Sequence, residues 1–378
     1  MKHYSLLSSV IIIYIIFITS NNCTAQKVDF KYKSLPKAFV TTTNVSLFQK
    51  KFVDLTLYLP SNYVKDGSVD YTSFLQKGID ANANVKMPNF SILVNDKGLL
   101  LKSNSIILFQ SSSTLLKSSS TQASYSVLNL NRVSNVKILN PVIVGDRQIH
   151  KGNKGEWGMG ISINSSSNVS IYNSNITNCW GDGIYIGNIN KIPSNNIMID
   201  GGKIDNNRRN GISIISGKKI TVRNIVLSNT NGTLPSAGID LEPNSNQDVL
   251  ENVVVENVIS YNNADAGFLI YLASMLGSIE NNVTISLIGI TDYYSPNALS
   301  IPGLRNDYKN NIKKISGNIK IQDFTSNGSK EVFARSSGNY VYTPKITVGN
   351  MKVISDSKRD LGKEDNVSNW MKSRKMRN

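Results

Sequence analysis

The sequence contains little cysteine and little charge, and it lacks a long apolar run beyond its first residues. Its two cysteines are Cys23 and Cys179, and removal of an export signal ending at residue 25 leaves only the second, so an intrachain disulfide is excluded. Only 18% of the residues are charged while 26 are glycine, which favours short strands and tight turns over helices. After residue 25 no stretch reaches the roughly 18 apolar residues that cross a bilayer, so we expect no membrane span.

The charge that is present is mostly positive. Lysine and arginine number 41 against 26 aspartates and glutamates, which gives a net charge of +15. A positive surface attracts polyanions in general. The charge is therefore compatible with nucleic acid, anionic lipid or acidic polysaccharide, and equally with a solvated surface that has no specific partner.

Residues 1–25 resemble a signal peptide. Lys2 and His3 form a short polar start, Leu6 to Ile18 supply the apolar stretch, and small residues precede a cleavage site before Gln26. A lipoprotein would instead carry its lipid on Cys23, but the residues before that cysteine lack the usual apolar side chain. We therefore expect a secreted or periplasmic bacterial protein rather than a lipid-anchored one.

One short phrase returns five times between residues 160 and 270, and its glycines are 23, 28, 27 and 29 residues apart. Self-similarity at this period predicts a solenoid, whose units bury their apolar faces only by stacking. Alternating apolar residues predict strands, and two or more strands per unit make the solenoid an all-β parallel β-helix. The leucine spacing of the rival leucine-rich repeat is missing. The copies are Gly160-Ile-Ser-Ile163, Gly183-Ile-Tyr-Ile186, Gly211-Ile-Ser-Ile214, Gly238-Ile-Asp-Leu241 and Gly267-Phe-Leu-Ile270.

The rest of the chain divides around this repeat. Residues 26–69 form an N-terminal extension, residues 70–354 the β-helix, and residues 355–378 a basic tail. Asp70 followed by apolar residues at helical spacing predicts a short helix over about 71–81. Such a helix would cover the open first coil, which otherwise exposes apolar core and unpaired backbone.

The register of the repeated strands predicts which side chains leave the core. If the flanking Ile and Leu side chains point inward, the third residue of each phrase points outward. This places Tyr185, Ser213 and Asp240 in one column, with Glu242 beside Asp240 on the same face. Like charges side by side on one strand repel, so a purely structural role rarely selects them.

The segments before these strands carry further polar and aromatic residues, which stacking should bring to one edge. Carboxylates serve as acid and base or hold Ca²⁺, arginines bind acidic sugars and aromatic faces stack on sugar rings. The structural alternatives are Asx-turns, asparagine ladders and surface ion pairs. We predict as catalytic candidates Asp182, Arg208, Arg209, Asp240 and Glu242, and as substrate-binding candidates His150, Glu156, Trp157, Trp180, Tyr185 and Ser213.

Together, the capping helix from Asp70, the stacked Gly-Ile strands and the signal peptide resemble the pectin-lyase-like superfamily of right-handed parallel β-helix proteins. The likeness covers roughly residues 60–350. It implies a secreted protein acting on polysaccharide as lyase, hydrolase or epimerase. The Gly-His-Gly and Arg-Ile-Lys motifs of polygalacturonases are absent, and Trp180-Gly-Asp-Gly183 has one aspartate of their usual pair. This argues against a standard polygalacturonase.

The resemblance and the charge together favour a lyase that cleaves an acidic, uronate-containing polysaccharide. A hydrolase with paired carboxylates and a non-catalytic glycan-binding solenoid are the alternatives. We expect acidic polysaccharide as the partner and no nucleic acid. Ca²⁺ is a candidate cofactor, but no residue is assigned as its ligand. The polymer and the oligomeric state stay open.

Overall fold

The computed structural model describes residues 30–45, 51–304, 312–334 and 341–354. The chain divides into Met1–Lys31, of which only residues 30 and 31 are described, and Tyr32–Asn378, which holds all of the elements below. The expected signal peptide (1–25) and basic tail (355–378) lie outside the described residues.

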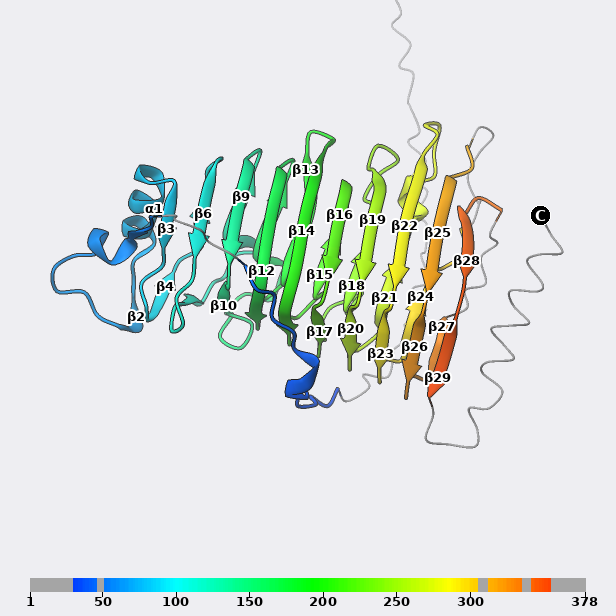
Figure 1. The fold of residues 1–378 in the computed structure, drawn as a ribbon, viewed down its shortest axis with the longest axis horizontal. Coiled ribbons are helices and arrows are strands. Elements are labelled where there is room, and N and C mark those ends of the chain that lie inside the picture. Colours follow the sequence, from blue (N-terminus) through cyan, green and yellow to red (C-terminus); the bar gives the residue numbers. More distant parts are fainter. Residues whose placement is uncertain (1–29, 46–50, 305–311, 335–340, 355–378) are drawn as a thin grey trace, which may run out of the picture. The chain divides into compact units, whose positions relative to one another are not determined.

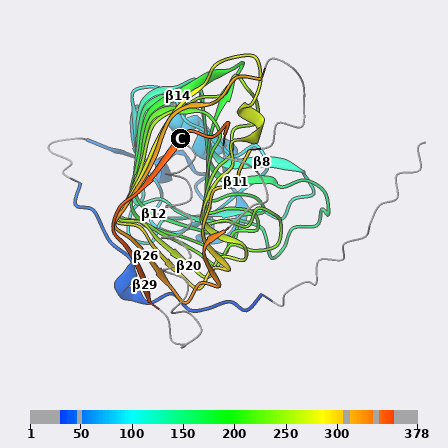
Figure 2. The ribbon, with the colours of Figure 1, turned by 90° about the vertical axis from the view of Figure 1, so that its right-hand side faces the viewer.

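The main unit is a parallel β-helix, as predicted, in which each coil adds one strand to each of three stacks (Figures 1 and 2). The first stack carries the repeated phrases. It consists of β5 (Leu99–Leu100), β8 (Ser124–Asn131), β11 (Trp157–Asn164), β13 (Ile184–Ile189), β15 (Ile212–Ile214), β18 (Ile239–Leu241), β21 (Ala266–Ile270), β24 (Asn297–Ser300) and β27 (Glu331–Ala334).

Two further stacks complete the coils. The second consists of β1 (Val53–Asp54), β3 (Asn84–Lys86), β6 (Ser105–Leu108), β9 (Ser134–Leu139), β12 (Ser167–Thr177), β14 (Ile192–Asp205), β16 (Gly217–Arg223), β19 (Leu250–Glu256), β22 (Asn282–Ile288), β25 (Ser316–Gln322) and β28 (Lys345–Val348). The third shares the ends of β12 and β14 and otherwise consists of β2 (Asp66–Asp70), β4 (Ser91–Val94), β7 (Thr114–Lys117), β10 (Val142–Val144), β17 (Val226–Ser228), β20 (Ile259–Tyr261), β23 (Thr291–Tyr293), β26 (Phe324–Asn327) and β29 (Met351–Ile354).

The predicted inward register of the first stack is confirmed. Ile184 pairs with Ile212, which pairs with Ile239 in the next coil, and none of the three is exposed. Residues opposite one another in parallel strands lie about 4.8 Å apart, so each isoleucine packs on its equivalents above and below. This continuous column is the apolar core that single coils cannot form alone.

The glycine that opens each phrase is required by close backbone approach between coils. A Cβ atom on Gly211 would lie 2.4 Å from the carbonyl oxygen of Gly238, and one on Gly238 would lie 2.7 Å from that of Gly267. These distances are shorter than any normal contact. The repeat keeps glycine there because a side chain would push the coils apart.

An asparagine ladder runs along the beginning of the second-stack strands. Asn135 donates to Asn104, Asn168 to Asn135 and Asn196 to Asn168, at 2.7–3.0 Å. All four have a positive φ near 55–60°, a conformation that asparagine tolerates better than most residues. Lys219 occupies the next position with φ 54° and interrupts the ladder before Asn252.

A short helix covers the first coils, as predicted. Helix α1 (Thr72–Ala81) buries Leu75 and Ile79, and the Asp70 carboxylate accepts a hydrogen bond from the Thr72 amide at 2.9 Å. The described residues also contain three 3₁₀ segments: η1 (Lys37–Phe39), η2 (Leu55–Tyr58) and η3 (Ala273–Met275). Within the described ranges no helix combines the length and apolar character needed to cross a membrane.

The segment 32–43 lies along the outside of the third stack. The side-chain amides of Asn173 and Asn229 each exchange two hydrogen bonds with the backbone of this segment, at Thr43 and Lys33 respectively. Phe39 stacks on Tyr293 with ring centroids 4.8 Å apart. Part of the predicted N-terminal extension is therefore fixed to the β-helix.

Candidate functional site

The predicted column on the first stack is present, and most of it is buried. Ser213 pairs with Asp240 on one side and with Tyr185 on the other, as the register required. Both Ser213 and Asp240 have no exposed surface. They point away from the apolar core but do not line an open strip, because the segment before β15 folds over them.

Asn210, which ends that segment, links the column together. Its side-chain amide donates to Ser213 Oγ and to Asp240 Oδ2, both at 3.0 Å, and its backbone amide donates to Asp182 Oδ1 at 3.1 Å. The sequence analysis did not select this residue. A signal existed, because Asp182 and Asn210 occupy the same position immediately before a phrase glycine.

Arg209 is the centre of the cluster. Its Nη1 lies 3.1 Å from Asp182 Oδ2, its Nε 3.7 Å from Glu156 Oε1 and its Nη2 3.6 Å from Glu242 Oε2. Although burial opposes it, attraction to these carboxylates and to Asp240 raises the pKa of Arg209. One guanidinium thus contacts three carboxylates and is attracted to a fourth, Asp240, and the four come from three parts of the coil stack.

The four carboxyl groups differ in exposure. Asp182 and Asp240 are buried, whereas the side chains of Glu156 and Glu242 remain 31% and 29% exposed. Because Glu156 and Glu242 contact the same guanidinium, their carboxylates lie within roughly 10 Å of each other, a limit that admits both the retaining and the inverting spacing of glycosidases. These two glutamates are the members that a ligand can reach.

Asp240 retains its proton more strongly than an ordinary aspartate. Burial, followed by repulsion from Glu242, raises its pKa well above the usual value. Its Oδ1 is buried without a hydrogen-bond partner among the described residues, apart from the carboxyl–carboxyl contact with Glu242 that also favours the protonated form. Burial likewise raises the pKa of Asp182, against the opposing effect of Arg209.

Two predicted sugar-binding residues lie in an internal stack. The His150 ring lies 3.8 Å from the Trp180 ring at 14°, and Arg208 Cζ lies 3.8 Å from the same indole. His150 Nδ1 is 2.8 Å from Asp146 Oδ2, and Tyr125 donates its hydroxyl to that carboxylate. The His150 side chain is fully buried, so the structure does not present it to a ligand.

The remaining predicted residues are more accessible. Trp157 is 48% exposed at the start of β11. Tyr185 is partly buried, and burial together with Asp182 raises its pKa to about 12, so its hydroxyl stays protonated. Arg208 is partly exposed beside Trp180, and burial lowers its pKa.

The cluster does not fit Ca²⁺. A calcium site needs several oxygen ligands around one central position. Here the guanidinium of Arg209 already occupies the centre of the carboxylates and supplies their counter-charge. Nowhere in the described part of the chain do three or more His, Cys, Asp or Glu side chains form a metal-ligand group.

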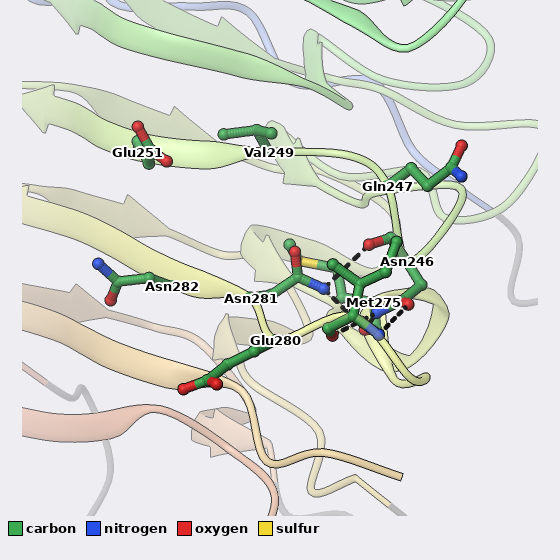
Figure 3. Close-up of a pocket in the computed structure, with 9 residues that line it drawn as sticks. Asn246, Gln247, Val249, Glu251, Met275, Glu280, Asn281 and Asn282 are labelled. Carbon is green, nitrogen blue, oxygen red and sulfur yellow. Dashed lines mark hydrogen bonds between the residues drawn. The ribbon is translucent and has the colours of Figure 1, made fainter. Parts of the chain in front are cut away.

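A separate pocket of about 350 Å³ lies between two loops that connect the first and second stacks (Figure 3). Its amides are used within the loops: Asn246 donates to Ile279 O at 3.0 Å, and Asn281 donates to Met275 O at 3.0 Å. None of the predicted site residues lines it. The pocket is lined by Asn246, Gln247, Val249, Glu251, Met275, Ile279, Glu280, Asn281 and Asn282.

Comparisons with known proteins agree with this architecture. A family model described as "Right handed beta helix region" matches residues 78–246 and 151–297, more than half of the chain. The chain therefore belongs to the right-handed β-helix family. This match confirms the predicted right-handed β-helix superfamily and does not identify a subfamily.

Individual relatives are more distant. The uncharacterized protein YclG of Bacillus subtilis is 32% identical over 140 residues, which are 33% of this chain and 24% of YclG. The prophage-derived uncharacterized protein YorA of the same organism is 30% identical over 135 residues, 31% of this chain and 23% of YorA. The matched region thus spans about a quarter of these relatives' length.

Solved structures share the fold at low identity. An iota-carrageenase complexed to iota-carrageenan fragments aligns with a TM-score of 0.57 at 12% identity, covering 87% of this chain and 95% of the carrageenase. An endo-xylogalacturonan hydrolase from Aspergillus tubingensis aligns with a TM-score of 0.53 at 15% identity, covering 78% and 84% of the two chains. Likeness at this level of identity establishes the fold only.

Proposed function

We propose that this protein is an extracellular, carbohydrate-active β-helix enzyme that hydrolyses glycosidic bonds in an acidic polysaccharide. The observation that carries the proposal is the pair of partly exposed carboxylates, Glu156 and Glu242, on one arginine and backed by two buried aspartates. Two such structural neighbours are named for acting on carrageenan and on xylogalacturonan, which supports the substrate class.

The geometry suggests different roles for the two glutamates. A protonated Asp240 beside Glu242 leaves the negative charge of the pair on Glu242, which suits a general base or nucleophile. Glu156 would then donate its proton to the leaving glycosidic oxygen, while Glu242 takes a proton from the attacking water or attacks the sugar itself. Arg209 and Asp182 act as positioning residues, since both are mostly buried.

A β-elimination lyase, favoured by the sequence alone, stays the second candidate. The observation in its favour is Arg208, whose guanidinium has no carboxylate within 4 Å among the described residues and could neutralise a uronate carboxylate. In β-elimination a base removes the proton next to the uronate carboxylate, the glycosidic C–O bond at the next carbon breaks, and its oxygen leaves with the other part of the polymer, so that an unsaturated sugar remains. Hydrolysis accounts better for a carboxylate pair around one arginine.

The test is a panel of acidic polysaccharides assayed for reducing ends and for the ultraviolet absorbance of unsaturated uronates. New reducing ends without absorbance support hydrolysis, whereas both signals together contradict it and support elimination. We expect Glu242→Gln to lower turnover at least roughly 100-fold, the usual contribution of a general acid or base. Neither signal on any polymer would contradict an enzyme and leave glycan binding.

A matched pair of variants separates catalysis from folding. Asp240→Asn and Asp292→Asn each remove one fully buried carboxyl group whose pKa is raised, but only Asp240 contacts the Arg209 cluster. We expect both variants to stay folded and only Asp240→Asn to lose activity. Equal activity in the two variants would remove Asp240 from the site.

A further inference from the structure

Two neighbouring arginines, predicted together as catalytic, have opposite electrostatic surroundings. Arg209 has three carboxylates within 4 Å. No carboxylate of the described residues lies within that distance of Arg208. Burial lowers the pKa of Arg208, and attraction to Glu156 offsets only part of this effect. Arg209 is thus neutralised by carboxylates of the protein, whereas Arg208 forms no ion pair with the described residues.

Arg208 is held in a fixed orientation by contacts that use only part of its guanidinium. Nη1 donates to Gly155 O at 3.0 Å and to Trp180 O at 3.4 Å, while Cζ lies 3.8 Å from the centre of the Trp180 ring. These bonds leave the N–H groups of Nε and Nη2 to a ligand. Planar, oriented donors of this kind match the two oxygens of a carboxylate or sulfate.

A second cation lies beside it. Arg147 Nη1 donates to the backbone oxygens of Asn206 and Asn207, and its Nη2 donates to Asn231 Oδ1 at 2.7 Å. Burial, and then the charge of Arg208, lowers the pKa of Arg147 to about 10. Asp205 and Glu156 attract the two arginines, but among the described residues neither arginine has a carboxylate within 4 Å, so a bound anion would relieve their mutual repulsion.

The backbone at Gly232 approaches both side chains closely. A Cβ atom on Gly232 would lie 3.1 Å from Arg208 Cγ and 3.5 Å from Arg147 Nη2, and Gly232 has a φ of +122°, which few other residues adopt. At this position the loop adds no side chain over Arg208, whereas the neighbouring Asn231 binds Arg147. The carbonyl that Arg208 binds belongs to Gly155, the residue directly before Glu156.

We propose that Arg208, backed by Arg147, forms a subsite for the carboxylate or sulfate group of an acidic glycan. The proposal rests on the proposed function, because it places the charged sugar next to Glu156 and therefore beside the bond that is cleaved. The two neighbouring arginines then have different roles. Arg209 positions the carboxylates of the enzyme, and Arg208 binds the acidic group of the substrate.

The test is direct binding, measured by titration and independent of turnover. The probes are polygalacturonate for carboxylate, iota-carrageenan for sulfate and agarose as a neutral polymer. Arg208→Gln is compared with Lys137→Gln, which removes the same unit of charge from an exposed position on β9. We expect Arg208→Gln to weaken binding of at least one acidic polymer roughly tenfold, equivalent to about 1.4 kcal/mol. Lys137→Gln should change binding less than about twofold, the effect of a surface charge.

Three results would overturn the subsite. They are equal losses in Arg208→Gln and Lys137→Gln, an equal loss for agarose, and no binding of either acidic polymer by the wild-type protein. Arg208→Lys keeps the charge but not the planar donors, so recovery of less than half of the lost binding energy supports oriented recognition, and full recovery contradicts it. Thermal unfolding of each variant verifies that the fold is intact.

Failure of the subsite and failure of the proposed function give different results. If Arg208→Gln loses acidic-polymer binding while no polymer is cleaved, the subsite stands without the enzyme. If the protein cleaves its polymer and Arg208→Gln leaves both KM and binding unchanged, the enzyme stands without the subsite. Glu242→Gln should reduce turnover but leave acidic-polymer binding within about twofold, because it removes no cation.

Discussion

Replacement of Asp292 by asparagine should remove part of the pH dependence of the free energy of unfolding. Asp292 is fully buried in β23 and accepts hydrogen bonds from Ser295 Oγ at 2.7 Å and Ser329 Oγ at 2.6 Å. Burial raises its pKa from 3.8 to about 6, against the opposing effect of these hydroxyls. The folded protein therefore holds this proton across a range of pH in which the unfolded chain has lost it.

The sign and size of the effect follow from that difference. Between about pH 4 and about pH 6 the folded state binds more protons, so stability falls as pH rises through this window. A pKa shift of about 2 units corresponds to about 3 kcal/mol. Above about pH 6 ionised Asp292 therefore lowers the free energy of unfolding by this full amount. An asparagine side chain at this position cannot ionise, and rotating hydroxyls can still hydrogen-bond to its amide.

We therefore expect Asp292→Asn to match the wild-type protein near pH 4 and to be up to about 3 kcal/mol more stable near pH 8. Urea unfolding followed by circular dichroism at several pH values measures the difference. Asp66→Asn is the control, because hydrogen bonds from Ser68 lower the pKa of exposed Asp66 and give its contribution the opposite slope. A variant that is less stable at every pH, with a profile parallel to wild type, would refute the reasoning.

Two further predictions concern the stacked coils. Lys219→Asn should raise the free energy of unfolding by about 1 kcal/mol, because it relieves a positive φ and joins Asn196 to Asn252 through the ladder; an unchanged or lower melting temperature would contradict this. Ile212→Lys should prevent folding, since a charge in the column of buried isoleucines cannot be solvated, whereas Ile212→Val should cost only about 1 kcal/mol. Circular dichroism of both Ile212 variants is the measurement, and a folded lysine variant with wild-type melting would contradict the inward register.

The fold could be predicted because the physical requirements of a coil are local and repeated. Gly211 avoids a collision with the next coil, Ile212 and Ile214 fill the core, and Asn168 takes a left-handed turn. Each requirement selects a residue type at a fixed offset, and each returns in the next coil. The alternation also predicts that the Asp240 side chain points away from the core, because a register shifted by one residue would point it inward.

The site could be predicted only in part, because register gives the direction of a side chain and not what lies above it. Asp240 points outward as predicted, but the segment that carries Arg209 and Asn210 covers it. Likewise, nothing in the local pattern shows that His150 pairs with Asp146 and lies against Trp180. These contacts are made by loops that differ from coil to coil, so the repeat pattern does not predict the conformation of the loops.

Two other buried carboxylates of the chain, Asp200 and Asp292, show what a structural role looks like and can be compared with Asp240. Asp200 accepts hydrogen bonds from Arg223, Asn224 and Thr43, and although burial opposes it, these bonds lower its pKa. Asp292 has a raised pKa but serine donors on both oxygens. A raised pKa alone therefore does not mark a site.

Asp240 differs from both in the state of its second oxygen. Its Oδ1 is buried without a donor among the described residues, and its neighbour Glu242 adds a like charge where a structural sheet would gain from a cation or an amide. The single arginine of the cluster interacts with four carboxyl groups, so its one positive charge does not offset their negative charge. Such an arrangement costs stability in the free protein, so these contacts argue against a purely structural role for Asp240.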